Sequence, residues 1–388
     1  MKSLASYYFL YYLGQAALMP YLSLYLSDKG ISSTLIGLLL SLWAFTSVIA
    51  QPIMGMLNDR LNDRRQILML CTILSPILAF GFYFFDAYFA LLIFSVLFPW
   101  FQSSSASLSD ALAVEIGSHA GISFGSIRLW GALSFSLASF VTGIVYERSG
   151  YGSSFFYFLI INAAVLGVLF LFPKIKPSEH KLSMFDQAKE VISHKRFLGF
   201  IGICLLVNLS IAINFSFLPI YFKEMGFNKA WIGTTYAIAA IIEVPMFWVS
   251  AKMNDKIGRL PVLCMAAICY AAKCLTLAFT HDIYLVLASQ LLDGMAYAFF
   301  ASASVEMVKS YSKDETQATF QTVFAAITTG LGGIIGGAFG GIFIDQMGAP
   351  FLYFILFALC MTAAVLFIIS NKMSNRSIKQ DWQKKSQL

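Results

Sequence analysis

Twelve runs of mostly apolar residues follow one another along the chain, and they limit its fold more than any other feature. A helix needs roughly 20 such residues to cross a bilayer. In hydrocarbon the backbone polar groups must be bonded within the segment, so runs of this length are helical. The sequence therefore predicts an all-α polytopic membrane protein. The expected spans are about 5–27, 33–57, 66–85, 88–113, 123–147, 153–173, 197–222, 229–251, 260–280, 284–308, 317–344 and 350–371.

Composition supports a membrane protein and excludes several other classes. Hydrophobic residues make up 59% of the 388 residues and charged residues 12%, against about 25% charged in soluble domains. The cysteines lie inside apolar runs, and the histidines lie in loops or at helix ends, so neither a disulfide framework nor a metal site is expected. The chain has no P-loop, HExxH or Ser-His-Asp pattern, which argues against ATP-driven transport and against an enzyme.

The net charge of +6 lies in short basic clusters between the apolar runs, which is typical of a topology signal rather than of nucleic-acid binding. Alternate loops differ strongly in their content of Lys and Arg. The loops that are poor in Lys and Arg hold only Lys29, Arg148, Lys223 and Lys229. The positive-inside rule places these four outside, which predicts a multi-pass protein of the cell (inner or plasma) membrane with both termini in the cytoplasm.

The chain divides near its middle into two similar halves. We expect a first six-helix bundle at 1–173, a cytoplasmic linker at 174–196, and a second bundle with a short tail at 197–388. Several residues recur at an offset of 196. The recurring positions are Asn58-Asp59-Arg60 and Asn254-Asp255-Lys256, Gly37 and Gly233, Gly30 and Gly226, and Tyr25 and Tyr221. A duplicated unit implies two pseudo-symmetric bundles with a binding site between them.

A polar motif separates the second and third spans. It holds Gly55, Asp59, Arg60, Arg64 and Arg65, and it resembles the G-x-L-x-D-R/K-x-G-x-R-K loop signature of the major facilitator superfamily. A weaker second copy includes Asp255. The resemblance implies a state-dependent latch at these residues. Simple positive-inside anchoring explains Arg64 and Arg65 almost as well.

Span eleven carries glycines four residues apart, at Gly333, Gly337 and Gly341. Small residues at this spacing allow two membrane helices to approach closely. We expect this face to pack against another helix, such as the one that leads into the loop motif, rather than to contact substrate.

Within the superfamily, the chain is most similar to the lactose-permease and phenylpropionate-permease branch of proton symporters. The run 7–12, the pair Gln51-Pro52 and the segment Arg128-Leu-Trp-Gly131 carry this resemblance in the first half. It implies substrate-binding roles for Asp110 on span four and Arg128 on span five, with Phe135 in place of a tryptophan that stacks on the sugar. In the second half, Lys273 corresponds to an arginine on span nine of lactose permease, and the resemblance implies a substrate-binding role for it. Asp293 stands at the position of that permease's span-ten histidine. Glu243 on span eight lies about one turn from the position where the permease has a coupling glutamate.

Charges inside the membrane need a cavity or a partner, because one near the bilayer centre costs at least ~2.5 kcal/mol. We expect Asp110 and Arg128 to form an ion pair that a substrate opens, since the guanidinium fork can bind a carboxylate or hydroxyl groups. Phe135 lies two turns from Arg128 on the same helix face and offers an apolar platform for a ring. The alternative is a fixed ion pair that only joins spans four and five.

Lys273, Glu243 and Asp293 form a second charged group. Desolvation favours the protonated form of a carboxyl group and a nearby ammonium favours the ionised form. An acid that loses its lysine partner in one conformation can therefore carry a proton, which makes Glu243 or Asp293 the candidate for coupling. The alternative is a permanent salt-bridge cluster.

These features together predict a secondary active transporter working by alternating access. The leading hypothesis is proton symport of a small polar solute that contains a ring, such as a sugar, a nucleoside or an aromatic acid. The proton gradient supplies the energy, with no cofactor or metal, and a monomer in the lipid bilayer suffices. A proton-driven efflux antiporter for drugs or metabolites is the alternative. A non-transporting sensor or enzyme is more remote, because the tail after about 372 is too short for an output domain.

Overall fold

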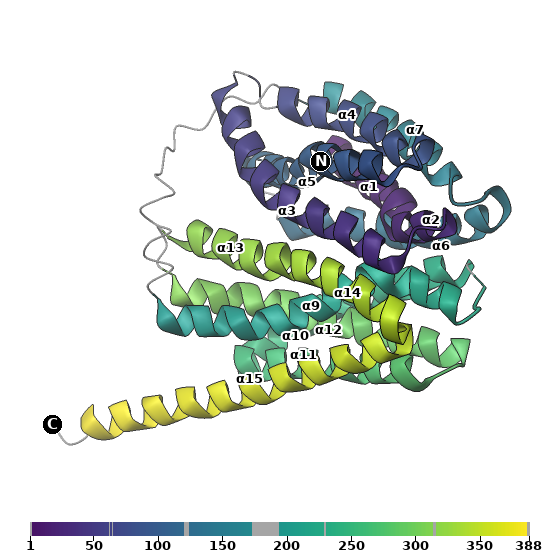
Figure 1. Ribbon diagram of the computed structural model, residues 1–388. Coiled ribbons are helices and arrows are strands. Elements are labelled where there is room, and N and C mark those ends of the chain that lie inside the picture. The colour runs from purple at the N-terminus through teal and green to yellow at the C-terminus, as the bar shows by residue number, and fades with distance from the viewer. Residues whose placement is uncertain are drawn as a thin grey trace. The chain divides into compact units, whose positions relative to one another are not determined.

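A computed structural model describes residues 2–61, 63, 65–119, 124–172, 194–228, 230–312 and 316–385. Throughout these residues every regular element is a helix (Figure 1). Eleven helical segments are long and apolar enough to cross a membrane. The predicted linker lies outside the described residues except for its last three positions, 194–196.

The first predicted span is present but broken. It consists of α1 (Lys2–Leu18), a 3-10 turn η1 (Met19–Tyr21) and α2 (Leu22–Asp28). Pro20 lies in the turn, and proline cannot donate the backbone hydrogen bond that an α-helix requires at that position. Neither α1 nor α2 alone reaches the length of a spanning helix, so counting the broken helix as one span brings the described total to twelve.

The remaining helices follow the predicted spans closely. In the first half they are α3 (Ser33–Arg60), α4 (Arg65–Phe84), α5 (Tyr88–His119), α6 (Phe124–Ser149) and α7 (Ser153–Phe170). In the second half they are α9 (Lys195–Glu224), α10 (Ala230–Ile257), α11 (Arg259–Phe279), α12 (Ile283–Tyr311), α13 (Gln317–Ala325), the π turn η2 (Ala326–Leu331), α14 (Gly332–Met347) and α15 (Ala349–Lys385). The expected all-α fold is confirmed.

Contacts divide the described chain into two compact units. Unit 1 combines residues of 1–182 with 212–241 and 333–349, and unit 2 combines residues of 183–211, 242–332 and 350–388. The division passes through α9 and α10, so each of these helices contributes one segment to each unit. Both cores combine aliphatic with aromatic side chains, for example Tyr7 and Phe172 in unit 1 and Phe197 and Phe299 in unit 2.

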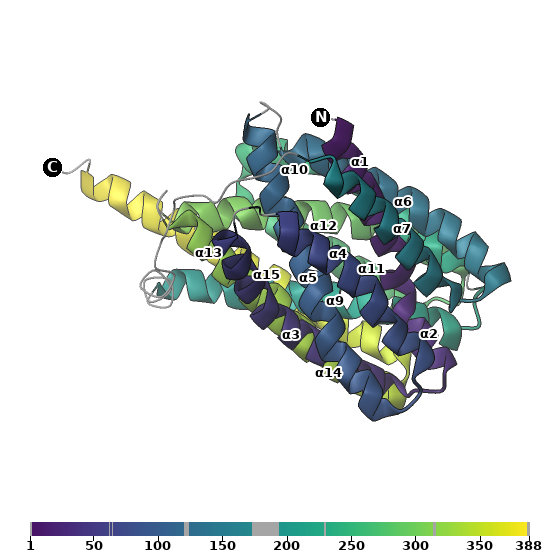
Figure 2. The same cartoon turned by 90° about the horizontal axis from the view of Figure 1, so that it is seen from above.

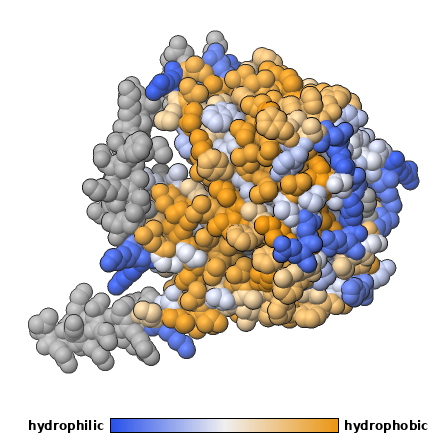
Figure 3. All heavy atoms as spheres, in the orientation of Figure 1, coloured by the Kyte–Doolittle hydropathy of each residue, from blue (hydrophilic) through white to orange (hydrophobic). Residues whose placement is uncertain are grey.

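Large apolar side chains also cover much of the surface. Phe89, Leu171 and Tyr284 are 75%, 73% and 71% exposed. Figure 3 shows a face on which hydrophobic side chains predominate. A soluble protein rarely exposes large contiguous apolar patches, whereas lipid-facing positions need no polar cover, so this surface fits a protein embedded in a bilayer.

Two close helix contacts within unit 1 depend on glycine. A Cβ at Gly37 of α3 would lie 2.1 Å from the carbonyl oxygen of Gly337 on α14, and one at Gly233 of α10 would lie 2.0 Å from the carbonyl oxygen of Ser139 on α6. Figure 2 shows α3 and α14 side by side. Gly333 and Gly341 meet the same face of α3, which confirms the packing role expected for the glycine-rich face.

Gly37 and Gly233 are also partners in the repeat of 196 residues, and each allows its helix to meet a helix of the other half of the chain. Gly30 and Gly226, another repeated pair, both adopt positive φ, at 84° and 68°. Each ends a helix at the same place in its half. The repeat read from the sequence is therefore also a repeat of backbone geometry and of helix packing.

Polar groups join the same helices at this end of unit 1. The Asp345 carboxylate on α14 accepts hydrogen bonds from the backbone N–H groups of Ser33 and Thr34, at 3.0 and 2.7 Å. It thereby caps the first turn of α3, where helix N–H groups lack partners within the helix. Lys223 at the end of α9 pairs with Asp28 at the end of α2 at 3.0 Å. We call four contacts together the loop-end contact: Gly37 with Gly337, Gly233 with Ser139, Asp345 with Ser33 and Thr34, and Lys223 with Asp28. The distribution of Lys and Arg among the loops predicts that this contact lies on the outer side of the membrane.

Candidate functional site

Arg128 is held on α6 by the ring of Tyr12 from α1. The guanidinium carbon lies 4.2 Å from the centre of that ring, a cation–π geometry. The ring also lies against the α6 backbone one turn further on, since a Cβ at Gly131 would come within 2.5 Å of it. Glycine at 131 therefore leaves room for Tyr12, and Tyr12 in turn fixes the plane of the guanidinium.

The guanidinium keeps an unused donor. Nη1 of Arg128 is buried and has no hydrogen-bond partner among the described residues. A buried polar group without a partner costs free energy, and more so when it is charged. Arg128 therefore gains from an added acceptor.

Asp110 lies near Arg128 but is held by a different residue. Its carboxylate accepts a 2.7 Å hydrogen bond from the Tyr8 hydroxyl, and Asp110 and Arg128, both described, form no direct ion pair. The expected ion pair is therefore not present. The physical reason is the spacing on α1: Tyr8 and Tyr12 lie one turn apart on one face, so one ring reaches the acid on α5 and the other reaches the arginine on α6.

The same helices carry further polar and aromatic side chains. Gln15 on α1 accepts a 2.7 Å hydrogen bond from Gln102 on α5. Phe135 is half-buried on α6, two turns beyond Arg128. The structure thus places Asp110 and Arg128 against the tyrosines of α1, with Phe135 on the same helix as Arg128.

The second charged cluster lies in unit 2. Lys273 on α11 is 1% exposed, and its ammonium lies 2.7 Å from a carboxylate oxygen of Asp293 on α12, which is 19% exposed. Glu243 is half-buried on α10. The ion pair expected for Lys273 is confirmed with Asp293.

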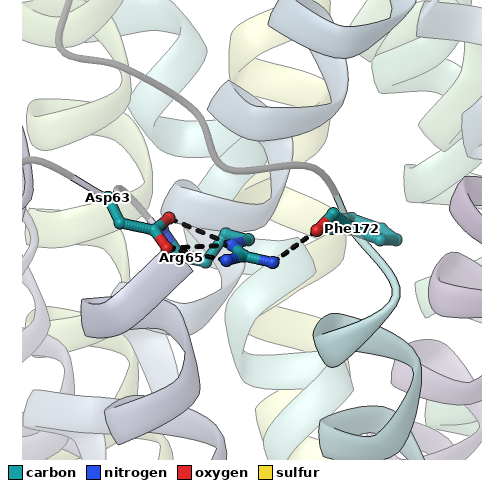
Figure 4. Close-up of polar contacts among 3 residues, drawn as sticks. All are labelled: Asp63, Arg65 and Phe172. Atoms are coloured by element: carbon teal, nitrogen blue, oxygen red, sulfur yellow. Dashed lines mark hydrogen bonds and ion pairs between the residues drawn. The ribbon is translucent and has the colours of Figure 1, made fainter.

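The loop motif shows a contact that the sequence reading missed. Asp63 accepts hydrogen bonds from the Arg65 guanidinium at 2.8 and 3.0 Å, and Arg65 also donates to the carbonyl of Phe172 at the end of α7 (Figure 4). Asp63 additionally accepts from the backbone N–H of Arg65 at the start of α4. Arg65 therefore joins the start of α4 to the end of α7.

The other motif residues are less constrained. Arg60 and Asp255 are exposed, and no atom lies within 4 Å of the position of a Cβ at Gly55. The side chain of Asp59 and all of Arg64 lie outside the described residues. The latch role of these residues remains a prediction.

The sequence held signals for the missed residues. Tyr8 and Tyr12 lie in the run that carries the resemblance in span one, and Asp63 stands just before a helix, where acids favour capping. Asp345 gave no such signal, because the helix that it caps lies about 310 residues away in the chain. Among the described residues, no group of three His, Cys, Asp or Glu side chains could hold a metal ion.

Sequence comparison finds a family that covers nearly the whole chain. The model of the MFS_1 like family matches residues 1–356. The uncharacterized transporter YwbF of Bacillus subtilis (strain 168) is 25% identical, over 97% of this chain and 96% of its own. Maltose permease of Geobacillus stearothermophilus is 23% identical, over 94% and 92%. The probable 3-phenylpropionic acid transporter of Escherichia coli (strain K12) is 24% identical, over 90% of each chain.

Solved structures agree with this assignment at the level of the fold. The nucleoside transporter NupG superposes with a TM-score of 0.82 at 18% identity, over 95% of this chain and 98% of the other. The relatives and structural neighbours are transporters, and the chain is not an enzyme. It belongs to the MFS_1 like family of the major facilitator superfamily and is a multi-pass membrane transporter of small molecules.

Proposed function

We propose that the chain is a proton-coupled symporter of a small polar solute that contains a ring. The substrate class is a sugar, a nucleoside or an aromatic acid, and transport proceeds by alternating access. The proposal rests above all on the buried Nη1 of Arg128, which lacks a hydrogen-bond partner among the described residues. A transported solute that carries an acceptor would satisfy this group while bound and leave it unsatisfied on release.

The names of the relatives support the substrate class. They include a maltose permease, a raffinose permease and a probable 3-phenylpropionic acid transporter. All three solutes combine a ring with oxygen acceptors. In this proposal Arg128 and Asp110 bind the polar groups of the solute, and Phe135 supports its ring.

A second candidate is proton-driven efflux. The sugar efflux transporter A of Dickeya chrysanthemi is 25% identical over 89% of this chain and 89% of its own. The same buried charges serve either direction. Symport and antiport differ in one observable, because a substrate gradient drives protons in the same direction as the solute in the first case and in the opposite direction in the second.

A ligand screen tests the substrate class directly. We expect one group among maltose-like sugars, nucleosides and aromatic carboxylates to raise the thermal unfolding midpoint of the purified protein, because a ligand that binds only the folded state stabilises it. The screen is run at pH 6 and pH 8, and proton coupling predicts that the apparent affinity differs between the two. No stabilisation by any of the three groups at either pH would contradict the proposed substrate class.

Proton coupling is assigned to Glu243 or Asp293. Asp293 is charge-paired with Lys273 here, and separation of this pair in another conformation would let the acid take up a proton. With the substrate found in the screen, we expect substrate-driven proton uptake into proteoliposomes to be lost in either Glu243→Gln or Asp293→Asn. Glu306→Gln is the matched control, since Glu306 pairs with Arg259 at 3.4 Å near the end of α12. Undiminished uptake in both test variants would rule out this assignment.

A further inference from the structure

A groove of about 200 Å³ lies between α11 and α15 in unit 2. Leu260, Pro261 and Cys264 of α11 form one wall, and Phe367 and Ile368 of α15 form the other. The thiol of Cys264 donates a weak hydrogen bond to the backbone carbonyl of Ala364 at 3.6 Å, so the two helices are in contact beside the groove. Figure 1 shows α11 and α15 next to each other.

The chemistry of the groove changes along its length. Its walls are apolar, and its polar side chains, Asn371 and Lys372, both come from α15. Lys372 is exposed and forms no ion pair with any side chain that the structure describes. Arg259 at the start of α11, next to Leu260 in the chain, is already paired with Glu306 at 3.4 Å. Lys372 is thus a cation beside an apolar groove, and no described acid neutralises its charge.

The groove lies where two apolar runs of the sequence end, which is where we expect the bilayer to end. The apolar run of α11 begins at Leu260, directly after Arg259, and that of α15 ends at Ile369, directly before Ser370, Asn371 and Lys372. A groove with apolar walls at the expected edge of the bilayer meets acyl chains on one side and lipid headgroups on the other. An apolar cavity of ~150 Å³ can hold a benzene molecule, so the groove has room for a short stretch of one acyl chain.

We propose that this groove binds one anionic phospholipid. An acyl chain packs between Leu260 and Ile368, and the headgroup phosphate accepts hydrogen bonds from the Lys372 ammonium. Basic pockets between membrane helices on the cytoplasmic side recognise anionic headgroups by this combination of charge and apolar contact. The site lies in unit 2, on different residues from the charged cluster at Lys273 and Asp293.

Titration of the purified full-length protein with dioleoyl phosphatidylglycerol or dioleoyl phosphatidylcholine, followed by native mass spectrometry, tests the proposal. The acyl chains are identical, so the comparison isolates the headgroup charge. We expect roughly fivefold tighter binding of the anionic lipid, the effect of about one basic residue near the surface. Lys372→Gln should remove this preference. Lys252→Gln is the control, because Lys252 lies 3.3 Å from the Trp248 ring on α10 and does not line the groove.

A second variant tests the acyl chain. Ile368→Trp places a larger side chain in the slot and should weaken binding of both lipids, while thermal unfolding of the variant checks that it is folded. Equal affinity of the unmodified protein for the two lipids would overturn the proposal, as would a preference that survives Lys372→Gln. Unchanged affinities in folded Ile368→Trp, or full displacement of the lipid by inorganic phosphate, would show that no acyl chain occupies the groove.

Discussion

Replacing Arg128 by alanine is expected to lower the apparent affinity for substrate by about 100-fold. Removing one partner of a buried charged hydrogen bond costs roughly 2–5 kcal/mol, and each 1.4 kcal/mol corresponds to about a tenfold change in affinity. Arg128→Lys keeps the charge but loses the planar fork and its stacking on Tyr12, so it should also be impaired, by about tenfold. Substrate binding by the purified variants measures both effects.

Arg148→Ala is the matched control, because Arg148 is an exposed arginine at the end of the same helix. Gly131→Ala adds a test of geometry. Its new Cβ would lie 2.5 Å from the Tyr12 ring, and it should weaken binding although every charge remains in place. If Arg128→Ala binds substrate as tightly as the unmodified protein, the unpartnered guanidinium is only a structural feature of α6 and the proposed site is wrong.

The spans could be predicted from the sequence because the signal is local. A run of apolar residues long enough to cross a bilayer leaves one outcome for the backbone, and α4, α7 and α11 begin and end close to the expected positions. The glycines at 333, 337 and 341 also gave a correct prediction, since small residues at that spacing have few uses other than close helix contact.

Side-chain partners were harder to predict than helices. The sequence correctly indicated that Lys273 needs an acid, and Asp293 provides it. The predicted ion pair between Asp110 and Arg128 was wrong. The choice between a direct ion pair and two separate tyrosine contacts depends on how α1 packs against α5 and α6. That packing is a tertiary property. The hydroxyl of Tyr8 is a good donor to Asp110 only once α1 and α5 are side by side.

The same distinction explains the loop-end contact. Gly37 and Gly233 were recognised as repeated residues, but their partners on α14 and α6 lie far away in the chain. The carboxylate of Asp345 has no local pattern that points to the first turn of α3. Sequence periodicity within one helix contains no information about contacts of this kind.

Gly233→Ala is expected to weaken the closed form of the loop-end contact. The new Cβ would lie 2.0 Å from the Ser139 carbonyl oxygen and 3.0 Å from the Cα of Gly143. Both are backbone atoms, so α10 must move away from α6 or the chain must strain. Overpacking of this type costs roughly 1–3 kcal/mol, which corresponds to a 5- to 150-fold shift of a two-state equilibrium toward the form in which this contact is open.

Hydrogen–deuterium exchange of residues 230–241 measures the shift, and substrate uptake measures its consequence. In the proposed alternating-access cycle this contact forms and breaks, so a transporter held open at this end should take up substrate more slowly even though Arg128 and Lys273 are unchanged. Gly202→Ala on α9 is the control, because no atom lies within 4 Å of its added Cβ. Since alanine favours helix more than glycine does, that variant should be neutral or slightly stabilised. Unchanged exchange and uptake in Gly233→Ala would mean that α6 and α10 separate without cost, and the glycine contact would then have no part in the transport cycle.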